Sequence, residues 1–118
     1  MWDGFNKRKF PRLSLRCEIT IHSEIVSAPV IAATENVGVG GVCVMLDTAL
    51  ERFSKCRVRL DLGHKIPDLE CEGKIVWIVP TKEPKAKTRF DVGIEFEGLE
   101  PVQIEQLRHF LQAETGVR

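Results

Sequence analysis

The sequence predicts a mainly β protein, a six-stranded antiparallel β-barrel that is followed by one C-terminal α-helix. Two observations predict the barrel. Apolar and polar side chains alternate with a period of two in segment after segment, and these segments are short and separated by turn residues. A third observation predicts the helix, because only the last segment changes to helical spacing. Short strands in such close succession are typical of a closed or nearly closed barrel.

The alternation of apolar and polar residues identifies each strand in turn along the chain. In the first, LRCEITIH, the apolar residues Leu15, Cys17, Ile19 and Ile21 alternate with polar ones, which predicts one buried and one wet face. The later strands show the same pattern with small variations. The six predicted strands are residues 15–22, 29–37, 41–46, 56–62, 69–79 and 90–96.

The fifth predicted strand departs from this pattern, because it is apolar on both faces from Ile75 to Val79. We expect another element to cover that end of the strand. The polar stretch PTKEPKAKT, residues 80–88, then predicts a long exposed hairpin loop.

The predicted helix spans residues 100–113, where Ile104, Leu107 and Leu111 form an apolar stripe with Phe110 beside it. Pro101 suits the first helical turn, and Gly116 suits a helix end. The stripe should pack on the barrel. Whether Phe110 packs there too or extends beyond it is open, so both a monomer and a weak homodimer are compatible with the sequence.

Composition limits the function classes. With 118 residues the chain fits one domain, and its formal net charge of zero argues against a protein that coats nucleic acid. No apolar run approaches a membrane span, and no apolar segment follows the charged start. We therefore expect no membrane insertion and a cytoplasmic protein.

Neither a metal site nor a catalytic site is predicted. The four cysteines form no C-x-x-C pair and sit in apolar-patterned segments, so we expect buried, reduced thiols. The three histidines lack ligand spacing to a cysteine or to each other. Common nucleophile, metalloprotease and P-loop motifs are missing, and most acidic residues alternate with core positions. The expected protein is not an enzyme.

Positive charge collects near the start of this neutral chain. The stretch NKRKFPRLSLR, residues 6–16, carries five basic side chains and no acidic one. Within it, Arg8 and Arg12 are four residues apart, and Pro11 restricts the chain between them. A guanidinium offers a planar fork of donors that fits phosphate oxygens and a guanine edge. Two such groups could converge on one anion, although a solvated arm has the same composition.

A second feature is NVGVGG, residues 36–41. Glycines permit close approach of a ligand to the backbone, and the Asn36 amide both donates and accepts hydrogen bonds. A simple turn or bulge between two strands is the alternative interpretation. Because VCVML continues as a strand and not as a helix, the glycines are not those of a dinucleotide-binding fold.

Together and in this order, the two features resemble the ligand signature of the PilZ family, R-x-x-x-R followed by [D/N]-x-S-x-x-G. Arg8 and Arg12 match the two arginines, Asn36 matches the Asp/Asn and Gly41 the closing glycine. Gly38 stands where the family has serine. The segments GKIVW, residues 73–77, and VGIEF, residues 92–96, are also similar to late strands of the family, and the likeness runs from about residue 7 to 112.

The resemblance implies a non-catalytic bacterial receptor for the second messenger cyclic di-GMP, with that nucleotide as ligand and no cofactor. It implies that the arginine arm wraps over the ligand and that the loop from Asn36 to Gly41 holds a guanine. By extension, Lys7, Lys9 and Gly40 join the expected binding residues. Ordering of the arm would pass the signal to a protein effector of unknown identity, in processes such as motility and biofilm formation.

The same resemblance divides the chain into segments. These are a tail at 1–6, a PilZ-like domain at 7–113 and a second tail at 114–118; within the domain, the arm is 7–14, the barrel 15–97 and the helix 100–113.

Gly38 is the departure that matters most. Losing one neutral hydrogen bond costs about 0.5–1.5 kcal/mol, and the added flexibility of a glycine about 0.5–1 kcal/mol more. Truncating one partner of a buried charge-assisted contact costs about 2–5 kcal/mol. Since both arginines are present, we expect weakened binding of cyclic di-GMP and not its loss.

Two alternatives stay open at the level of sequence. One is a degenerate PilZ-type module that contacts proteins and no longer binds the nucleotide, as Gly38 would allow. The other is a small barrel that binds nucleic acid. The chain has no tyrosine for base stacking, and we expect Phe90, Phe96 and Trp77 in core or covered positions, which argues against nucleic acid as a partner.

Overall fold

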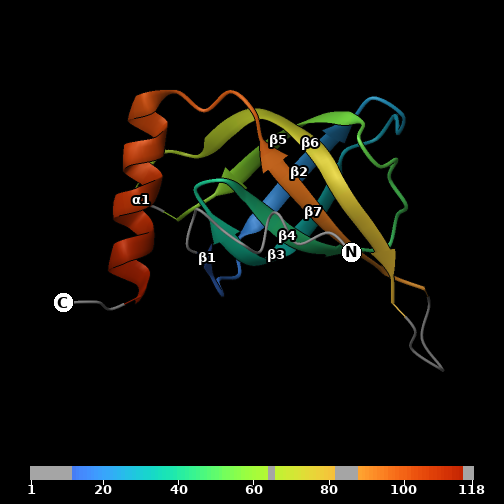
Figure 1. Ribbon diagram of the computed structural model, residues 1–118, viewed down its shortest axis with the longest axis horizontal. Coiled ribbons are helices and arrows are strands. Elements are labelled where there is room, and N and C mark those ends of the chain that lie inside the picture. The colour runs from blue at the N-terminus through green and yellow to red at the C-terminus, as the bar shows by residue number, and fades with distance from the viewer. Residues whose placement is uncertain (1–11, 64–65, 82–87, 116–118) are drawn as a thin grey trace.

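The computed structural model describes residues 12–63, 66–81 and 88–115. Within these ranges it contains seven strands and one helix (Figure 1). The elements are β1 (Arg12–Leu13), β2 (Glu18–Ser23), β3 (Val30–Gly38), β4 (Gly41–Leu46), β5 (Lys55–Asp61), β6 (Leu69–Pro80), β7 (Phe90–Phe96) and α1 (Pro101–Thr115).

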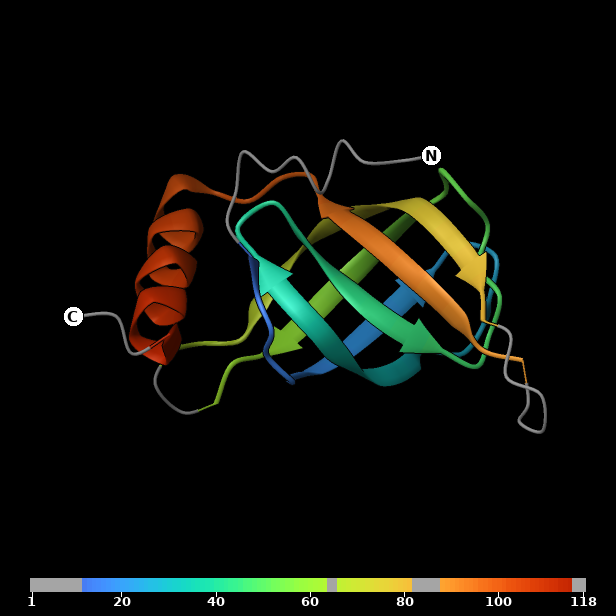
Figure 2. The same cartoon turned by 60° about the horizontal axis from the view of Figure 1, so that its bottom comes forward.

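Six of these strands close into an antiparallel barrel, as the sequence predicts. The strands follow the order β3-β2-β5-β6-β7-β4, and β4 pairs back with β3 to close the ring (Figure 2). The two-residue β1 adds to β3 on the edge that β2 also uses. It lies inside the segment predicted to be the arm, and a strand of two residues shows no alternation by which it could be predicted.

The core is the inner face of the barrel. Val37, Val42, Ile94 and Ile75 lie side by side across β3, β4, β7 and β6, and none exposes any surface. β-Branched side chains favour such positions, because they pack well on a pleated surface. Because successive side chains of a strand point to opposite faces, the residues next to this inward row point to the outer face of the barrel.

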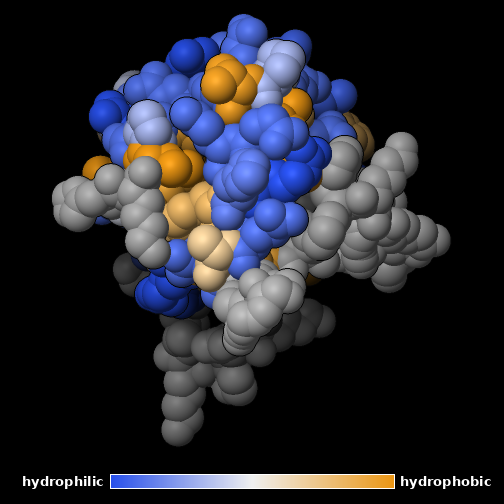
Figure 3. Space-filling model, turned by 90° about the vertical axis from the view of Figure 1, so that its left-hand side faces the viewer, coloured by the Kyte–Doolittle hydropathy of each residue, from blue (hydrophilic) through white to orange (hydrophobic). Residues whose placement is uncertain are grey.

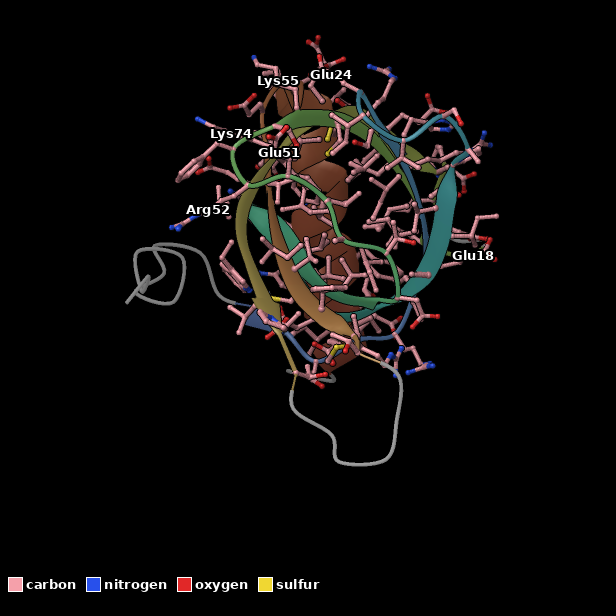
Figure 4. The ribbon with its side chains drawn as sticks, turned by 90° about the vertical axis from the view of Figure 1, so that its right-hand side faces the viewer. Glu18, Glu24, Glu51, Arg52, Lys55 and Lys74 are labelled. Atoms are coloured by element: carbon pink, nitrogen blue, oxygen red, sulfur yellow. The ribbon has the colours of Figure 1, made fainter. Side chains whose placement is uncertain are left out.

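Helix α1 covers one end of the barrel, and the view along the barrel shows it behind the ring of strands (Figure 4). Its first turn is capped by Gln103, whose Oε1 accepts a 2.8 Å hydrogen bond from the Glu100 N–H, and Pro101 takes the first position. Leu107, Phe110 and Leu111 are buried in the barrel core. Phe110 therefore does not extend beyond the barrel.

The surface around α1 is mostly hydrophilic, and its hydrophobic residues form small separate groups (Figure 3). On the helix itself Val102 is the large exposed hydrophobic residue among those described. The described residues of this face thus offer a homodimer little apolar area.

The expectation that another element covers the end of β6 is wrong for Val79 but not for Val76, which is buried and beside which the loop between β4 and β5 donates a hydrogen bond. The alternation breaks because of a β-bulge: Ile75 pairs with Ile94 and Trp77 with Gly93, which leaves Val76 as the extra residue. Val79, near the end of the strand, is 52% exposed. The bulge adds one unpaired residue, so Ile75 and Val76 are both buried, whereas Trp77 and Val79 are apolar residues on the outer face.

All four cysteines are free thiols and buried, as predicted. Burial raises the pKa of Cys56 to about 12 and that of Cys71 to about 11, because a thiolate is disfavoured away from water. Most of the predicted loop at 80–88 lies outside the described residues.

Among the described residues, no three or more histidine, cysteine or acidic side chains form a group suited to a metal ion. No helix within them has the length and apolar character needed to cross a membrane.

Candidate ligand-binding site

The site is built where the end of the arginine motif meets the glycine loop. In the β1–β3 pair, Arg12 lies opposite Gly38 and Leu13 opposite Val37. The structure therefore brings together two motifs that are far apart in the sequence. Lys7, Arg8 and Lys9 lie outside the described residues, so their contacts with a ligand stay predictions.

Thr34 anchors the chain between β1 and β2. Its side chain is buried, and its Oγ1 donates a 2.7 Å hydrogen bond to the Leu15 carbonyl and accepts a 2.9 Å bond from the Cys17 N–H. The Thr34 N–H also donates to the Cys17 carbonyl over 2.8 Å. These bonds fix the segment that follows β1, and so they hold Arg12 in register beside the loop.

Sequence reasoning missed Thr34. The available signal was its position, because it follows Val30 and Ala32 on the inward face of a predicted strand. A polar residue at such a position needs a partner for its hydroxyl.

A second β-bulge turns Asn36 outward. The β3–β4 register runs Thr34 to Val44, Asn36 to Cys43 and Val37 to Val42, so the extra residue lies between Thr34 and Asn36. Strict alternation from the inward Thr34 would bury the amide of Asn36, and the bulge reverses this. Asn36 thus lies on the outer face, where it is half-buried, and its contact with a ligand stays a prediction.

The loop between β3 and β4 contains the remaining predicted residues. Gly38 and Gly41 are buried and end the two strands, while Gly40 is half-buried. The Gly40 carbonyl accepts a 2.9 Å hydrogen bond from the Phe96 N–H, which ties the loop to β7. Because these three residues lack side chains, the loop backbone can pack closely against the neighbouring strands.

On the outer face, one row of residues crosses four strands. It contains Asn36, Cys43, Gly93 and Trp77, each directly opposite the next. The Trp77 ring lies on the backbone of Gly93, since a Cβ there would come within 2.5 Å of the ring carbons. Small residues therefore form a floor between the Asn36 amide and the indole.

Trp77 is half-buried on the outer face, so of its two predicted positions, core or covered, the core is wrong. The shift produced by the Val76 bulge explains the error, because it moves Trp77 to the face opposite to that of Ile75. The sequence signal that could have found this arrangement is the pairing of a large aromatic with a glycine on the neighbouring strand.

Asp91 lies beside this row on β7, and its carboxyl group is partly buried. Burial raises the pKa of Asp91, while a hydrogen bond with Trp77 acts in the opposite direction. Its Oδ1 atom is buried and has no hydrogen-bond partner among the described residues. The carboxyl group therefore orients the indole and leaves one acceptor unused.

The chemistry of this surface suits a planar, polar group. It combines an amide that donates and accepts, the half-buried Gly40 and an indole, next to the segment that carries the basic run. A flat heteroaromatic ring with hydrogen-bonding edges fits the row, and anionic groups fit the basic segment.

Comparison with known proteins agrees with this fold. Three solved structures resemble the chain with TM-scores of 0.70 to 0.75 and 12% to 17% sequence identity. The first is the PilZ domain of YcgR from Escherichia coli, solved with c-di-GMP; here the similarity covers 95% of this chain and 99% of that one, at 14% identity and a TM-score of 0.72.

The other two structures are longer proteins. The Bacillus subtilis inhibitor of motility MotI/DgrA is 17% identical with a TM-score of 0.75, and the match covers 95% of this chain and 53% of that one. The K. pneumonia MrkH–c-di-GMP complex is 12% identical with a TM-score of 0.70, and the match covers 92% and 52%. The chain thus spans about half the length of each.

Comparison with curated protein sequences gave no match. The family model described as PilZ domain, however, matches residues 6–113, which is most of the chain and includes both motifs and most of the helix. With that match and the barrel it accompanies, the chain belongs to the PilZ domain family.

Proposed function

We propose that this PilZ domain is a non-catalytic receptor for cyclic di-GMP that acts in the cytoplasm. The nucleotide binds between the arginine motif, Arg8 to Arg12, and the loop from Asn36 to Gly41. Binding orders the arm and thereby changes how the domain meets a protein effector. The match to the family and the likeness to two structures solved with c-di-GMP support this function.

The observation that carries the proposal is the pairing of Arg12 with Gly38. A ligand that spans both motifs needs them side by side, and the two-residue β1 provides that arrangement at the level of the backbone. The Thr34 hydrogen bonds hold it in place before any ligand binds, which reduces the ordering cost of binding.

Each part of the ligand has a complementary part of the site. Cyclic di-GMP carries two phosphates and two guanines, and arginine forks suit both phosphate oxygens and the O6/N7 edge of guanine. Asn36 offers an amide to a guanine edge, and Trp77 offers an aromatic surface at the other end of the row. We include Trp77 in the proposed site, together with Lys7, Lys9, Gly38, Gly40 and Gly41.

Isothermal titration of the purified chain with cyclic di-GMP tests the proposal. We expect saturable binding that Arg12→Ala weakens by about 30-fold or more, since a charge-assisted contact contributes about 2–5 kcal/mol. Arg108→Ala is the matched control, because Arg108 is an exposed arginine of α1 that pairs with Glu105. Equal binding by the parent chain and Arg12→Ala, or no binding by the parent chain, would contradict the proposal.

A second candidate function rests on Gly38, which replaces the serine of the family signature. In that case the chain is a PilZ-type module for protein contacts that has lost the nucleotide. An Arg8→Ala chain distinguishes the two in cells and in pull-down of partners. If the chain is a protein-contact module, Arg8→Ala should change neither the phenotype nor the partners. If it is a receptor, Arg8→Ala should abolish the response to cyclic di-GMP.

A further inference from the structure

Phe53, in the loop between β4 and β5, has an unusual backbone conformation and an exposed side chain. Its φ is 68°, and it is the non-glycine residue with positive φ among those described. A bulky side chain is strongly disfavoured there, and glycine or asparagine is the usual choice. Phe53 nevertheless exposes 57% of its surface, so burial in the core does not offset the strain.

The backbone holds this conformation in place. The Phe53 N–H donates a 2.6 Å hydrogen bond to the Ile75 carbonyl, and the Ile75 N–H donates a 3.0 Å bond to the Ser54 carbonyl. Both bonds form at the Val76 bulge of β6, where the regular ladder is interrupted. The loop would make the same two bonds with glycine at position 53. The phenyl ring is therefore not needed for the turn.

Two cations frame the ring. The guanidinium of Arg52 lies 4.6 Å from the ring centroid, and the Lys74 ammonium lies 5.8 Å from it. The Arg52 Nε donates a 3.3 Å hydrogen bond to the Val76 carbonyl, which fixes the guanidinium beside the ring. Neither cation forms an ion pair with an acidic side chain in the part of the chain that the structure describes. Figure 4 shows Arg52 and Lys74 on the same side of the barrel.

The surrounding charges decide which partner fits. Lys55 lies on the same side of the barrel but is paired with Glu97 at 3.7 Å, and Glu51 lies nearby (Figure 4). With these carboxylates present, the region has no broad positive field for a nucleic-acid backbone or an anionic membrane. What it offers is one exposed aromatic ring beside two cations, neither of which is in an ion pair with any described residue. A protein segment with an apolar side chain beside one or two carboxylates is complementary to it.

We infer that the Phe53 patch, defined as Arg52, Phe53 and Lys74, is a docking surface for an acidic segment of a partner protein. Exposed aromatics and arginines are the residue types that contribute most at protein interfaces, and desolvation on binding strengthens contacts of carboxylates with both cations. The strained conformation keeps the ring at the surface before the partner arrives. This inference stands apart from nucleotide binding, because the patch contains no residue of the proposed ligand site.

The test uses a displayed library of random short peptides, selected against the whole parent chain and counter-selected against Phe53→Gly. We expect the selected peptides to be rich in Asp and Glu around an apolar residue. A synthetic copy of one of them, titrated into isotope-labelled protein, should shift the amide signals of the patch. The affinity of this peptide should fall at least tenfold for the Phe53→Gly chain. It should fall as much for the double variant that combines Arg52→Gln with Lys74→Gln. Val102→Ser, which removes an exposed apolar residue from α1, should leave the affinity unchanged.

The melting temperature of the Phe53→Gly chain distinguishes a docking role of the ring from a structural one. Glycine accepts the positive φ, so its melting temperature should equal or exceed that of the parent chain although peptide binding is lost. A clearly lower melting temperature would make the ring structural and overturn the inference. Three other results would also overturn it: selected peptides without acidic residues, tighter binding of single-stranded DNA at the same residues, or self-association of the chain that Phe53→Gly abolishes.

Discussion

Arg12 and Gly38 are direct neighbours across the β1–β3 pair, so the last arginine of one motif is fixed beside the variant residue of the other. Without β1, the arginine motif would be tethered to the barrel only through residues 14–17. The proposed site thus depends on a strand of two residues and on the buried threonine that holds the chain behind it.

Gly38→Ser is expected to tighten the binding of cyclic di-GMP about three- to tenfold, because the restored hydroxyl adds a hydrogen bond of about 0.5–1.5 kcal/mol. Isothermal titration measures the change. Gly38→Ala is the matched control, since it adds the same Cβ without the hydroxyl. Equal tightening in both variants would mean that the hydroxyl is not responsible, and weaker binding of Gly38→Ser would contradict the assigned role.

Thr34→Val is expected to lower the free energy of unfolding by about 1–3 kcal/mol, because the Cys17 N–H and the Leu15 carbonyl lose their partner. Urea denaturation measures the loss. Thr20→Val is the control, since Thr20 lies on β2 in a half-exposed position and should change stability by no more than about 0.5 kcal/mol. A Thr34→Val chain as stable as the control would show that these two bonds do not anchor the segment.

Gly93→Ala should destabilise the fold by about 1–3 kcal/mol through overpacking, because its Cβ would come within 2.5 Å of the Trp77 ring. A double-mutant cycle with Trp77→Ala checks the cause. If the clash is with the indole, Gly93→Ala should cost much less in the Trp77→Ala background than in the parent chain. Strictly additive effects would place the cause elsewhere.

The buried thiols predict a loss of stability at high pH. The pKa of Cys56 is about 12 and that of Cys71 about 11 in the folded chain, against an ordinary value of 9.0. Above pH 9 the unfolded chain therefore binds fewer protons than the folded one, and stability falls as pH rises through the folded values. Below pH 9 both states keep the protons, and this contribution is constant.

Urea midpoints from about pH 8 to about pH 10 measure this slope, and Cys56→Ala should reduce it relative to the parent chain. The remaining titrating groups are common to both chains, so their effects cancel in the comparison. An identical slope in the two chains would contradict a raised pKa at Cys56. Slow reaction of the folded chain with a thiol reagent, and fast reaction in urea, is the accompanying expectation.

Much of the fold follows from side-chain periodicity. In β5 the alternation of Cys56, Val58 and Leu60 with charged residues is enough to identify a strand and its inner face, and Leu107 and Leu111 identify the helix stripe in the same way. These signals work because burial repeats with the geometry of the element.

Features that depend on the backbone were not predictable in this way. A strand as short as β1 shows no period, and the bulges near Glu35 and at Val76 change the outward face without any distinctive residue type. Strict alternation thus leaves Asn36 inward and Trp77 on the wrong face. The positive φ of Phe53 likewise has no sequence signal, because phenylalanine is an unusual residue for it.

The most direct test of the central claim is an amide correlation spectrum of the isotope-labelled chain recorded during titration with cyclic di-GMP. If both motifs form one site, the largest chemical-shift changes should occur together at Arg12, Leu13 and residues 36–41. The Trp77 indole signal should move at the same ligand concentration. At the same nucleotide concentration, Arg12→Ala should reduce all of these shifts together. Shifts confined to one motif, shifts on another face of the barrel, or none at saturating nucleotide would contradict the account.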